Sequence, residues 1–142
     1  MQRAIELARE AAEYGEVPVG AVLVKDNQII AECFNCTEEF RDPTAHAEIL
    51  AIRRACDMLD NGRLEDCDLY VTLEPCPMCA QAISFARIRR LYFGAHDPKG
   101  GGVENGPRIF SQPTCHHKPE IYGGINAHQC SEMLKDFFKA KR

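Results

Sequence analysis

The chain is 142 residues long, and this length predicts a single domain spanning residues 1–142, because domains commonly contain roughly 100–150 residues. Apolar residues make up 45% and charged residues 27%, which excludes a disordered, collagen-like or coiled-coil chain. The formal net charge of -4 excludes the uniformly basic surface that nucleic-acid-binding domains often carry, so any basic patch must be local.

The same sequence predicts a cytoplasmic protein with no membrane association. No apolar run approaches the roughly 18 residues that a membrane helix needs, and residues 1–16 lack the continuous apolar core of a signal peptide. The chain has eight cysteines, and in the cytosol disulfides are rare. We therefore expect reduced thiols that are available for metal binding or catalysis.

The beginning of the chain predicts a helix followed by a β-hairpin. Residues 4–12 place alanine, isoleucine and leucine at helical spacing with charged residues between them, which is the pattern of an amphipathic helix. Two apolar, β-branched runs at 17–24 and 28–34 flank Lys25-Asp26-Asn27. A short polar break between two such runs favours a hairpin.

From residue 45 onward, helices and strands alternate. The expected elements are a helix at 45–59 with Thr44 as its N-cap, a strand at 68–73, a helix at 75–88, a strand at 89–95 and a final helix at 131–142. This order predicts an α/β fold with helices packed on a mixed sheet. Residues 96–118 are rich in glycine and proline and predict a long functional loop, because structureless loops beyond about 12–15 residues are uncommon.

Three metal-ligating side chains stand at the starts of two of the expected helices. His46 begins one helix, and Cys76 and Cys79 begin the other, three residues apart and so on one side of it. One imidazole and two thiolates suit zinc, and three protein ligands leave the fourth tetrahedral position open to water, as in a catalytic site. The positive ends of the two helix dipoles would also stabilise the thiolates.

Glu48 is the candidate for acid–base work at this site. It lies two residues from His46, so a helix turns its side chain away from the imidazole, and we expect it not to hold the metal. Zinc can lower the pKa of bound water from 15.7 to about 7, and a nearby carboxylate can take that proton and return it to a leaving group. Hydrolytic chemistry is therefore expected.

Two other interpretations of the cysteines stay open. Cys33 and Cys36 form a second C-x-x-C pair, and together with Cys76 and Cys79 they would make a four-cysteine structural zinc site. Buried cysteines also act as small hydrophobic residues without any metal. The four-cysteine site leaves His46 and Glu48 without a role.

His-Ala-Glu followed by Pro-Cys-x-x-Cys at 75–79 is the signature of the cytidine deaminase superfamily, whose members deaminate bases. Outside the motif, the chain resembles the bacterial tRNA-specific adenosine deaminases of that superfamily nearly from end to end. The similar segments are 16–24, 42–53, 69–83, 93–101 and 136–138. Residues 104–110 and the pair His116-His117 differ from the sequence that is usual at these positions in other members.

The resemblance implies a three-layer α/β/α, cytidine deaminase-like fold with a five-stranded mixed sheet, one Zn²⁺ per subunit, and a homodimer. The implied reaction is the hydrolytic deamination of adenosine to inosine at the wobble position of a tRNA anticodon, with an arginine tRNA as the expected substrate. Carried over by position, the implied site residues are the zinc ligands His46, Cys76 and Cys79, the proton shuttle Glu48, the nucleotide contact Asn35, and Asp97 and Lys99 beside the RNA.

The residues themselves give further hints about the substrate. Val19, Ala45 and Leu73 stand beside the motifs and could form apolar walls around a base, although ordinary packing explains them equally well. At the C-terminus, aromatic and basic residues combine in the way that suits unpaired nucleotides: Phe137, Phe138, Lys139, Lys141 and Arg142. One phenylalanine is expected in the core, and Phe138 is taken as an RNA contact.

Two competing functions remain at this point. The net negative charge favours a small substrate, so a deaminase of a free nucleobase or nucleoside, such as cytosine, guanine or cytidine, is the alternative enzyme. A structural zinc module that binds a partner protein is the alternative outside enzymes. Zinc that survives replacement of Cys33 and Cys36 would favour the enzyme, and zinc loss would favour the module.

Overall fold

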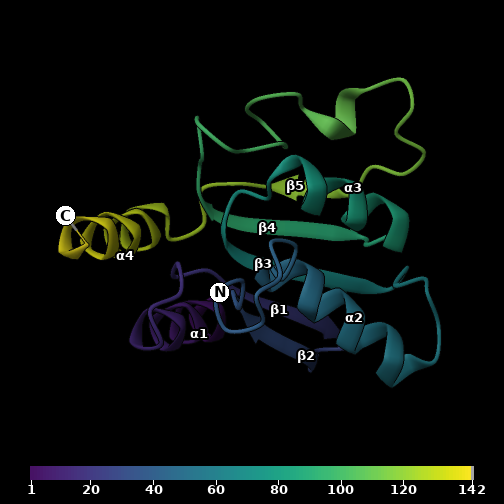
Figure 1. Ribbon diagram of the computed structural model, residues 1–142. Coiled ribbons are helices and arrows are strands. Elements are labelled where there is room, and N and C mark those ends of the chain that lie inside the picture. Colours follow the sequence, from purple (N-terminus) through teal and green to yellow (C-terminus); the bar gives the residue numbers. More distant parts are fainter. Residues whose placement is uncertain (142) are drawn as a thin grey trace.

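The computed structural model describes residues 1–141 and shows a five-stranded mixed sheet in the order β2-β1-β3-β4-β5 (Figure 1). β1 pairs antiparallel with β2 and with β3, whereas β3–β4 and β4–β5 are parallel pairs. The strands are Gly20–Lys25 (β1), Gln28–Phe34 (β2), Cys67–Leu73 (β3), Arg90–Ala95 (β4) and Glu120–Tyr122 (β5). The helices are Gln2–Glu13 (α1), Ala47–Leu59 (α2), Pro77–Ala86 (α3) and Ala127–Ala140 (α4), with a 3-10 turn at Ile109–Ser111 (η1).

Helices cover both faces of this sheet, so the expected three-layer α/β/α arrangement is confirmed (Figure 1). On one face, the main core packs α2 and α3 against inward residues such as Leu23, Leu69 and Phe93. On the other face, α1 packs on Val22 and α4 places Cys130 against Ala95. Neighbouring strand residues therefore serve opposite layers, as the two-residue period of a strand requires.

The predicted hairpin is confirmed, with one change at its start. Asp26 and Asn27 form the two-residue loop and both have positive φ, of 51° and 62°, as a type I′ turn needs. The strand begins at Gly20 rather than at residue 17. Residues 17–19 leave the sheet, and the N–H of Val19 bonds the carbonyl of Val17 at 2.8 Å.

Thr44 does not cap α2, contrary to expectation. Its N–H and its hydroxyl both donate to one carboxylate oxygen of Asp42, at 2.8 and 2.7 Å, so this side chain serves the preceding turn. His46 occupies the N-cap position with an extended backbone and makes no side-chain capping bond. The imidazole is therefore free for another purpose at the start of the helix.

α3 begins and ends inside the predicted range 75–88. Pro77 is its first residue, where a missing N–H costs no hydrogen bond, and Cys76 is the N-cap. Arg87 ends the helix with a left-handed backbone at φ 63°. The helix joins β3 to the parallel strand β4, as the alternating pattern predicted.

The C-terminal third differs most from the prediction. α4 begins at Ala127, four residues before the expected start, and the expected residue 142 lies outside the described part of the chain. Ala127-His128-Gln129 carries little apolar signal, but Cys130 next to it is fully buried. The long loop is present, and it contains η1 and leads into the short edge strand β5.

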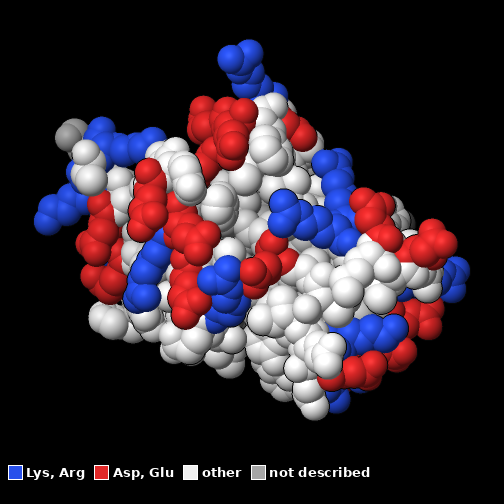
Figure 2. Space-filling model, turned by 90° about the horizontal axis from the view of Figure 1, so that it is seen from below, with Lys and Arg blue, Asp and Glu red and all other residues white. Residues whose placement is uncertain are grey.

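Charge on the described surface is mixed. Figure 2 shows Lys and Arg interspersed with Asp and Glu on the face that it presents. No helix within residues 1–141 is long and apolar enough to cross a bilayer. The eight cysteines, all within the described residues, form no disulfide.

Candidate active site

His46, Cys76 and Cys79 come together where α2 and α3 begin. The Nδ1 atom of His46 lies 3.6 Å from the Sγ of Cys76 and 3.5 Å from the Sγ of Cys79, and all three ligand atoms lie within 4.8 Å of one another. His46 and Cys76 are the N-caps of the two helices, and Cys79 is in the first turn of α3. Both positive helix ends thus meet at one cluster, as predicted.

This donor set fits a zinc ion. Zinc binds imidazole nitrogen at roughly 2.0–2.1 Å and thiolate sulfur at about 2.3 Å, so in a tetrahedron the nitrogen and sulfur atoms lie about 3.5 Å apart. The two nitrogen–sulfur distances of 3.6 and 3.5 Å match that spacing. Three ligands also leave one tetrahedral position for a water or substrate atom.

The electrostatics of the cluster favour a thiolate. Contact with the Cys79 thiol, followed by the hydrogen bond to His46, lowers the pKa of Cys76 to about 4. The hydrogen bond to Cys76 in turn raises the pKa of His46. Contact with Cys76 and burial raise the pKa of Cys79, so the pair shares one proton until a cation takes its place.

Glu48 lies in the first turn of α2, beside the three ligands but outside their group. Its side chain is almost fully buried, at 3% exposure, and burial raises the pKa of its carboxyl to about 7. A carboxyl that titrates near neutral pH can both accept and release a proton there, which is the property of a general acid–base group.

A cavity of about 330 Å³ opens onto the cluster, which lies within the size range of ligand pockets. His46, Glu48 and Cys76 form one part of its lining. Val19 and Leu73 line it as expected, whereas Ala45 is fully buried and does not. Val17 also lines the cavity, so the residues that were wrongly expected to extend β1 form part of its wall.

Of the four expected substrate contacts, two line this cavity. Asn35 is 93% buried, and within residues 1–141 no hydrogen bond engages its side-chain amide, so it can meet a ligand. Asp97 follows β4, and its carboxylate accepts the N–H groups of Lys99 and Gly100 at 3.1 and 3.0 Å. Lys99 is exposed beside the cavity and does not line it.

Phe138, the fourth expected contact, is on α4 and does not line the cavity. It is 47% exposed, and its ring packs edge-on against Phe137 at 5.3 Å. Phe137 is only partly buried, so the expectation that one of the two belongs to the core is wrong. Lys141 covers the Phe137 ring and reaches the carbonyl of Gly15, near the segment that leads into the cavity wall.

Glu74 is a site residue that sequence reasoning missed. It is 98% buried, lines the cavity and directly follows β3. Its carboxylate accepts the backbone N–H groups of Asp97, Val103, Glu104 and Asn105 at 2.9–3.1 Å and the Asn105 side-chain amide at 2.7 Å. Burial by itself would raise the pKa of Glu74, but the hydrogen bonds from Asp97 and Asn105 outweigh burial and lower it.

These five donors assign Glu74 a positioning role. A carboxylate offers about four lone-pair directions, so five N–H donors leave none for a metal or a substrate proton. Gly101 lies against this carboxylate, because a Cβ there would come within 2.6 Å of it. A Cβ on Gly102 would likewise come within 2.6 Å of the backbone nitrogen of Pro77. The long loop can therefore pack on α3 only because neither position carries a side chain. The glycine run at 100–102 was the sequence signal for this close packing, but it was interpreted as part of a long functional loop.

Cys33 and Cys36 do not join the metal cluster. Within residues 1–141, His46, Cys76 and Cys79 are the one group that could hold a metal, and this removes the four-cysteine site. Cys36 donates to the carbonyl of Phe34 at 3.3 Å, and burial raises the pKa of Cys33 to about 11. Both cysteines therefore act as buried structural residues.

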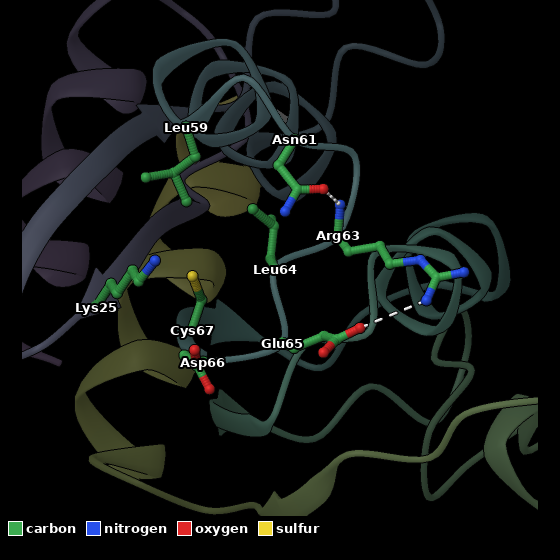
Figure 3. A pocket seen from close by; sticks show the side chains of 8 residues that line it. All are labelled: Lys25, Leu59, Asn61, Arg63, Leu64, Glu65, Asp66 and Cys67. Atoms are coloured by element: carbon green, nitrogen blue, oxygen red, sulfur yellow. Dashed lines mark hydrogen bonds and ion pairs between the residues drawn. The ribbon is translucent and has the colours of Figure 1, made fainter.

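A second pocket lies at the opposite end of β3 and has a different character (Figure 3). Lys25, Arg63 and Glu65 surround it, and Arg63 pairs with Glu65 at 3.6 Å. Cys67, the first residue of β3, contributes a thiol whose pKa is raised by burial. None of the metal-binding group lies in this pocket.

Comparison with known proteins agrees with this site. The model of the cytidine and deoxycytidylate deaminase zinc-binding region matches residues 1–95, which include the three clustered ligands and Glu48. The fold and the cluster are therefore those of a zinc-binding deaminase.

Individual relatives show to which family of zinc-binding deaminases the chain belongs. A tRNA-specific adenosine deaminase of Agrobacterium fabrum is 60% identical over all 142 residues and 93% of its own length. A solved tRNA:A34 deaminase, studied for A-to-I editing at the wobble position, is 60% identical with a TM-score of 0.93, over 94% of this chain and 97% of that one. The chain belongs to the family of tRNA-specific adenosine deaminases.

A guanine deaminase of Bacillus subtilis is a more distant structural relative. It is 36% identical with a TM-score of 0.66, over 99% of this chain and 90% of that one. The same fold thus also carries deamination of a free base, and the choice of substrate has to be argued from the site.

Proposed function

We propose that this chain is a zinc-dependent tRNA adenosine deaminase that converts adenosine to inosine at the wobble position of an anticodon, with an arginine tRNA as substrate. The observation that carries the proposal is the open three-ligand cluster beside buried Glu48, in a chain 60% identical over its full length to a tRNA-specific adenosine deaminase. We further propose that residues 1–142 form one deaminase domain that works in the cytoplasm, where tRNA is available.

In this proposal His46, Cys76 and Cys79 hold one zinc ion per chain. When bound, zinc supplies a nucleophile at neutral pH, because it lowers the pKa of a bound water from 15.7 to about 7. Glu48 receives a proton from the attacking water at its carboxylate and returns a proton to the departing amino group. Water and adenosine then become inosine and ammonia.

The cavity walls hold the base in this reaction. Val19 and Leu73 offer apolar surfaces to the faces of the ring, and the free amide of Asn35 can hydrogen-bond the sugar or the edge of the base. An adenosine in an anticodon loop has to leave its stack to enter such a cavity, and unpaired loop nucleotides do this at low cost.

The experiment measures inosine in an arginine tRNA transcript, in parallel with free adenosine, cytidine, cytosine and guanine at equal concentration. We expect inosine at the wobble position alone. A transcript with guanosine at that position is the matched control and should remain unchanged. Rapid deamination of free guanine with an unmodified tRNA would instead identify a free-base deaminase, the function of the Bacillus subtilis relative.

We also propose that the protein is a homodimer. Large apolar side chains on α2 and α3 are exposed, at 64% for Met58 and 70% for Phe85, and exposed apolar surface often marks an interface. Sedimentation at micromolar concentration should give twice the chain mass. A fully active monomer would refute the dimer.

A further inference from the structure

A further hollow, distinct from the pocket of Figure 3, shares one wall with the active cavity. It has a volume of about 540 Å³, and we call it the outer groove. Its lining residues include His96, Pro98, Glu104, Arg108, Ser111 and Lys118. Residues 96–98 are the shared wall. His96 and Pro98 line the outer groove, whereas Asp97 between them lines the active cavity.

Glu74 holds the rest of this wall in place. Its carboxylate lines the active cavity and accepts the N–H groups of Glu104 and Asn105, whose own atoms line the outer groove on the other side. The two hollows therefore share one wall, which consists of residues 96–98 and of the segment hydrogen-bonded to Glu74. A polynucleotide with one nucleotide in the active cavity would reach the outer groove by passing over the rim of this wall.

The lining of the outer groove carries more positive than negative charge, with Arg108 and Lys118 against the single carboxylate of Glu104. Arg108 and Lys118 are exposed, and neither forms an ion pair within residues 1–141. The one acid of the lining, Glu104, lies 3.4 Å from His96. By contrast, Arg90 on β4 is held by Glu120 at 3.3 Å. Two uncompensated cations beside the Ser111 hydroxyl are suited to an anion.

We infer that the outer groove binds the phosphodiester backbone of the nucleotide next to the one that is deaminated. The inference rests on the proposed RNA substrate, since only a polynucleotide has backbone on either side of the reacting base. Proteins that hold single strands combine a positively charged groove along the backbone with pockets for bases. Arginine binds phosphate through its planar fork and lysine as a point charge, so Arg108 and Lys118 match this ligand.

The test compares two variants that each lose one arginine and one lysine. The first is Arg108→Gln with Lys118→Gln in the outer groove. The matched control is Lys25→Gln with Arg63→Gln, at the pocket shown in Figure 3 at the far end of β3. The probe is an anticodon stem-loop RNA with adenosine at the wobble position, and binding is measured from about 50 to 200 mM salt, where phosphate contacts are strongly screened.

Loss of two phosphate contacts should reduce the salt slope by about 1.4, because each contact on a single strand contributes about 0.7. Over this fourfold range of salt, the affinity of the unaltered protein should fall about sevenfold more than that of the groove variant. The control should keep the original slope. Zinc content should stay unchanged in both variants, and the control should also keep the turnover of the unaltered protein.

Two results would overturn the inference. Equal losses in the groove variant and in the control would show a general effect of net charge, and an unchanged slope in the groove variant would show that the phosphates lie elsewhere. The proposed function is judged separately by inosine in the unaltered protein. If the unaltered protein forms no inosine while the groove variant still binds RNA with the reduced salt slope, the proposed reaction is wrong and the backbone site is supported.

Discussion

Glu74 and Asn105 are 31 residues apart in the chain and are joined by two hydrogen bonds. The carboxylate of Glu74 accepts the backbone N–H of Asn105 at 3.0 Å and its side-chain amide at 2.7 Å. This contact ties the end of β3, from which the two zinc-cluster cysteines follow, to the long loop after β4. The wall of the cavity thus depends on a carboxylate whose oxygens accept five N–H donors.

Replacing Glu74 by Gln should lower the free energy of unfolding by about 2–4 kcal/mol. The amide nitrogen would replace one acceptor oxygen and face buried N–H donors, and leaving such donors unpaired costs about 1–3 kcal/mol each. Denaturant unfolding measures the change. The variant should also show a higher KM for RNA with zinc retained, because Asp97 and Gly100 would no longer be held at the cavity.

Glu65→Gln is the control for this prediction. Glu65 is an exposed carboxylate whose only ion pair is to Arg63, within residues 1–141, and exposed pairs contribute about 0–1 kcal/mol. A Glu74→Gln protein as stable as Glu65→Gln would show that the five hydrogen bonds matter little. A loss of stability without any change in KM would show that Glu74 supports the fold alone.

The cysteine pair of the metal cluster could be predicted from local spacing, whereas His46 lies 30 residues from Cys76 and was predicted from its place at a helix start and from the family signature. Cys76 and Cys79 lie in one helix turn. His46 and Cys76 both lie at helix starts, which proline and polar residues predict from the sequence. What sequence reasoning could not supply is which strand ends meet. β3 and β4 are parallel neighbours, so their carboxyl ends bring Glu74 and Asp97 to one edge of the sheet, and only the pairing shows this.

Other errors also have a physical origin. Val17 and Val19 have the β-branched side chains of a strand, yet residues 17–19 lie outside β1 because Pro18 between them has no N–H to donate to a sheet ladder. Thr44 is a good N-cap type, but Asp42 engages its hydroxyl first. The early start of α4 depends on buried Cys130, whose contacts with Ile5 and Ala95 are distant in sequence.

The cysteine pairs allow a direct test of the zinc site. Cys76→Ser with Cys79→Ser should bind no zinc, because two of the three ligands are lost. Cys33→Ser with Cys36→Ser is the matched control and should keep one zinc per chain, since these thiols lie outside the cluster. Metal analysis of the purified proteins decides the matter. Zinc loss in the control alone would revive the structural zinc module.

Glu48→Gln should keep its zinc and lose turnover. The amide fills the same buried space but cannot carry a proton between water and the leaving amino group. Removing a general acid–base group typically reduces the rate by about 10²–10⁴-fold. Single-turnover assays with zinc-loaded protein measure the loss. A rate within a few-fold of the unaltered protein would assign the proton transfers to another group.

The C-terminal helix offers a test of how RNA is held outside the cavity. Phe138 is exposed on α4, and base stacking on an aromatic ring contributes about 1–3 kcal/mol per base, so Phe138→Ala should weaken RNA binding by about 5- to 150-fold. Phe138→Tyr retains a flat ring and should bind RNA normally, whereas Phe138→Leu is apolar but cannot stack and should behave as the alanine variant does.

Removing residues 139–142 should add a salt-dependent loss of RNA affinity, because lysines and an arginine are deleted. All four variants should retain zinc. Normal affinity in both the alanine and the leucine variants would show that the end of α4 is a solvated helix terminus and that the RNA is bound by the cavity and its surroundings.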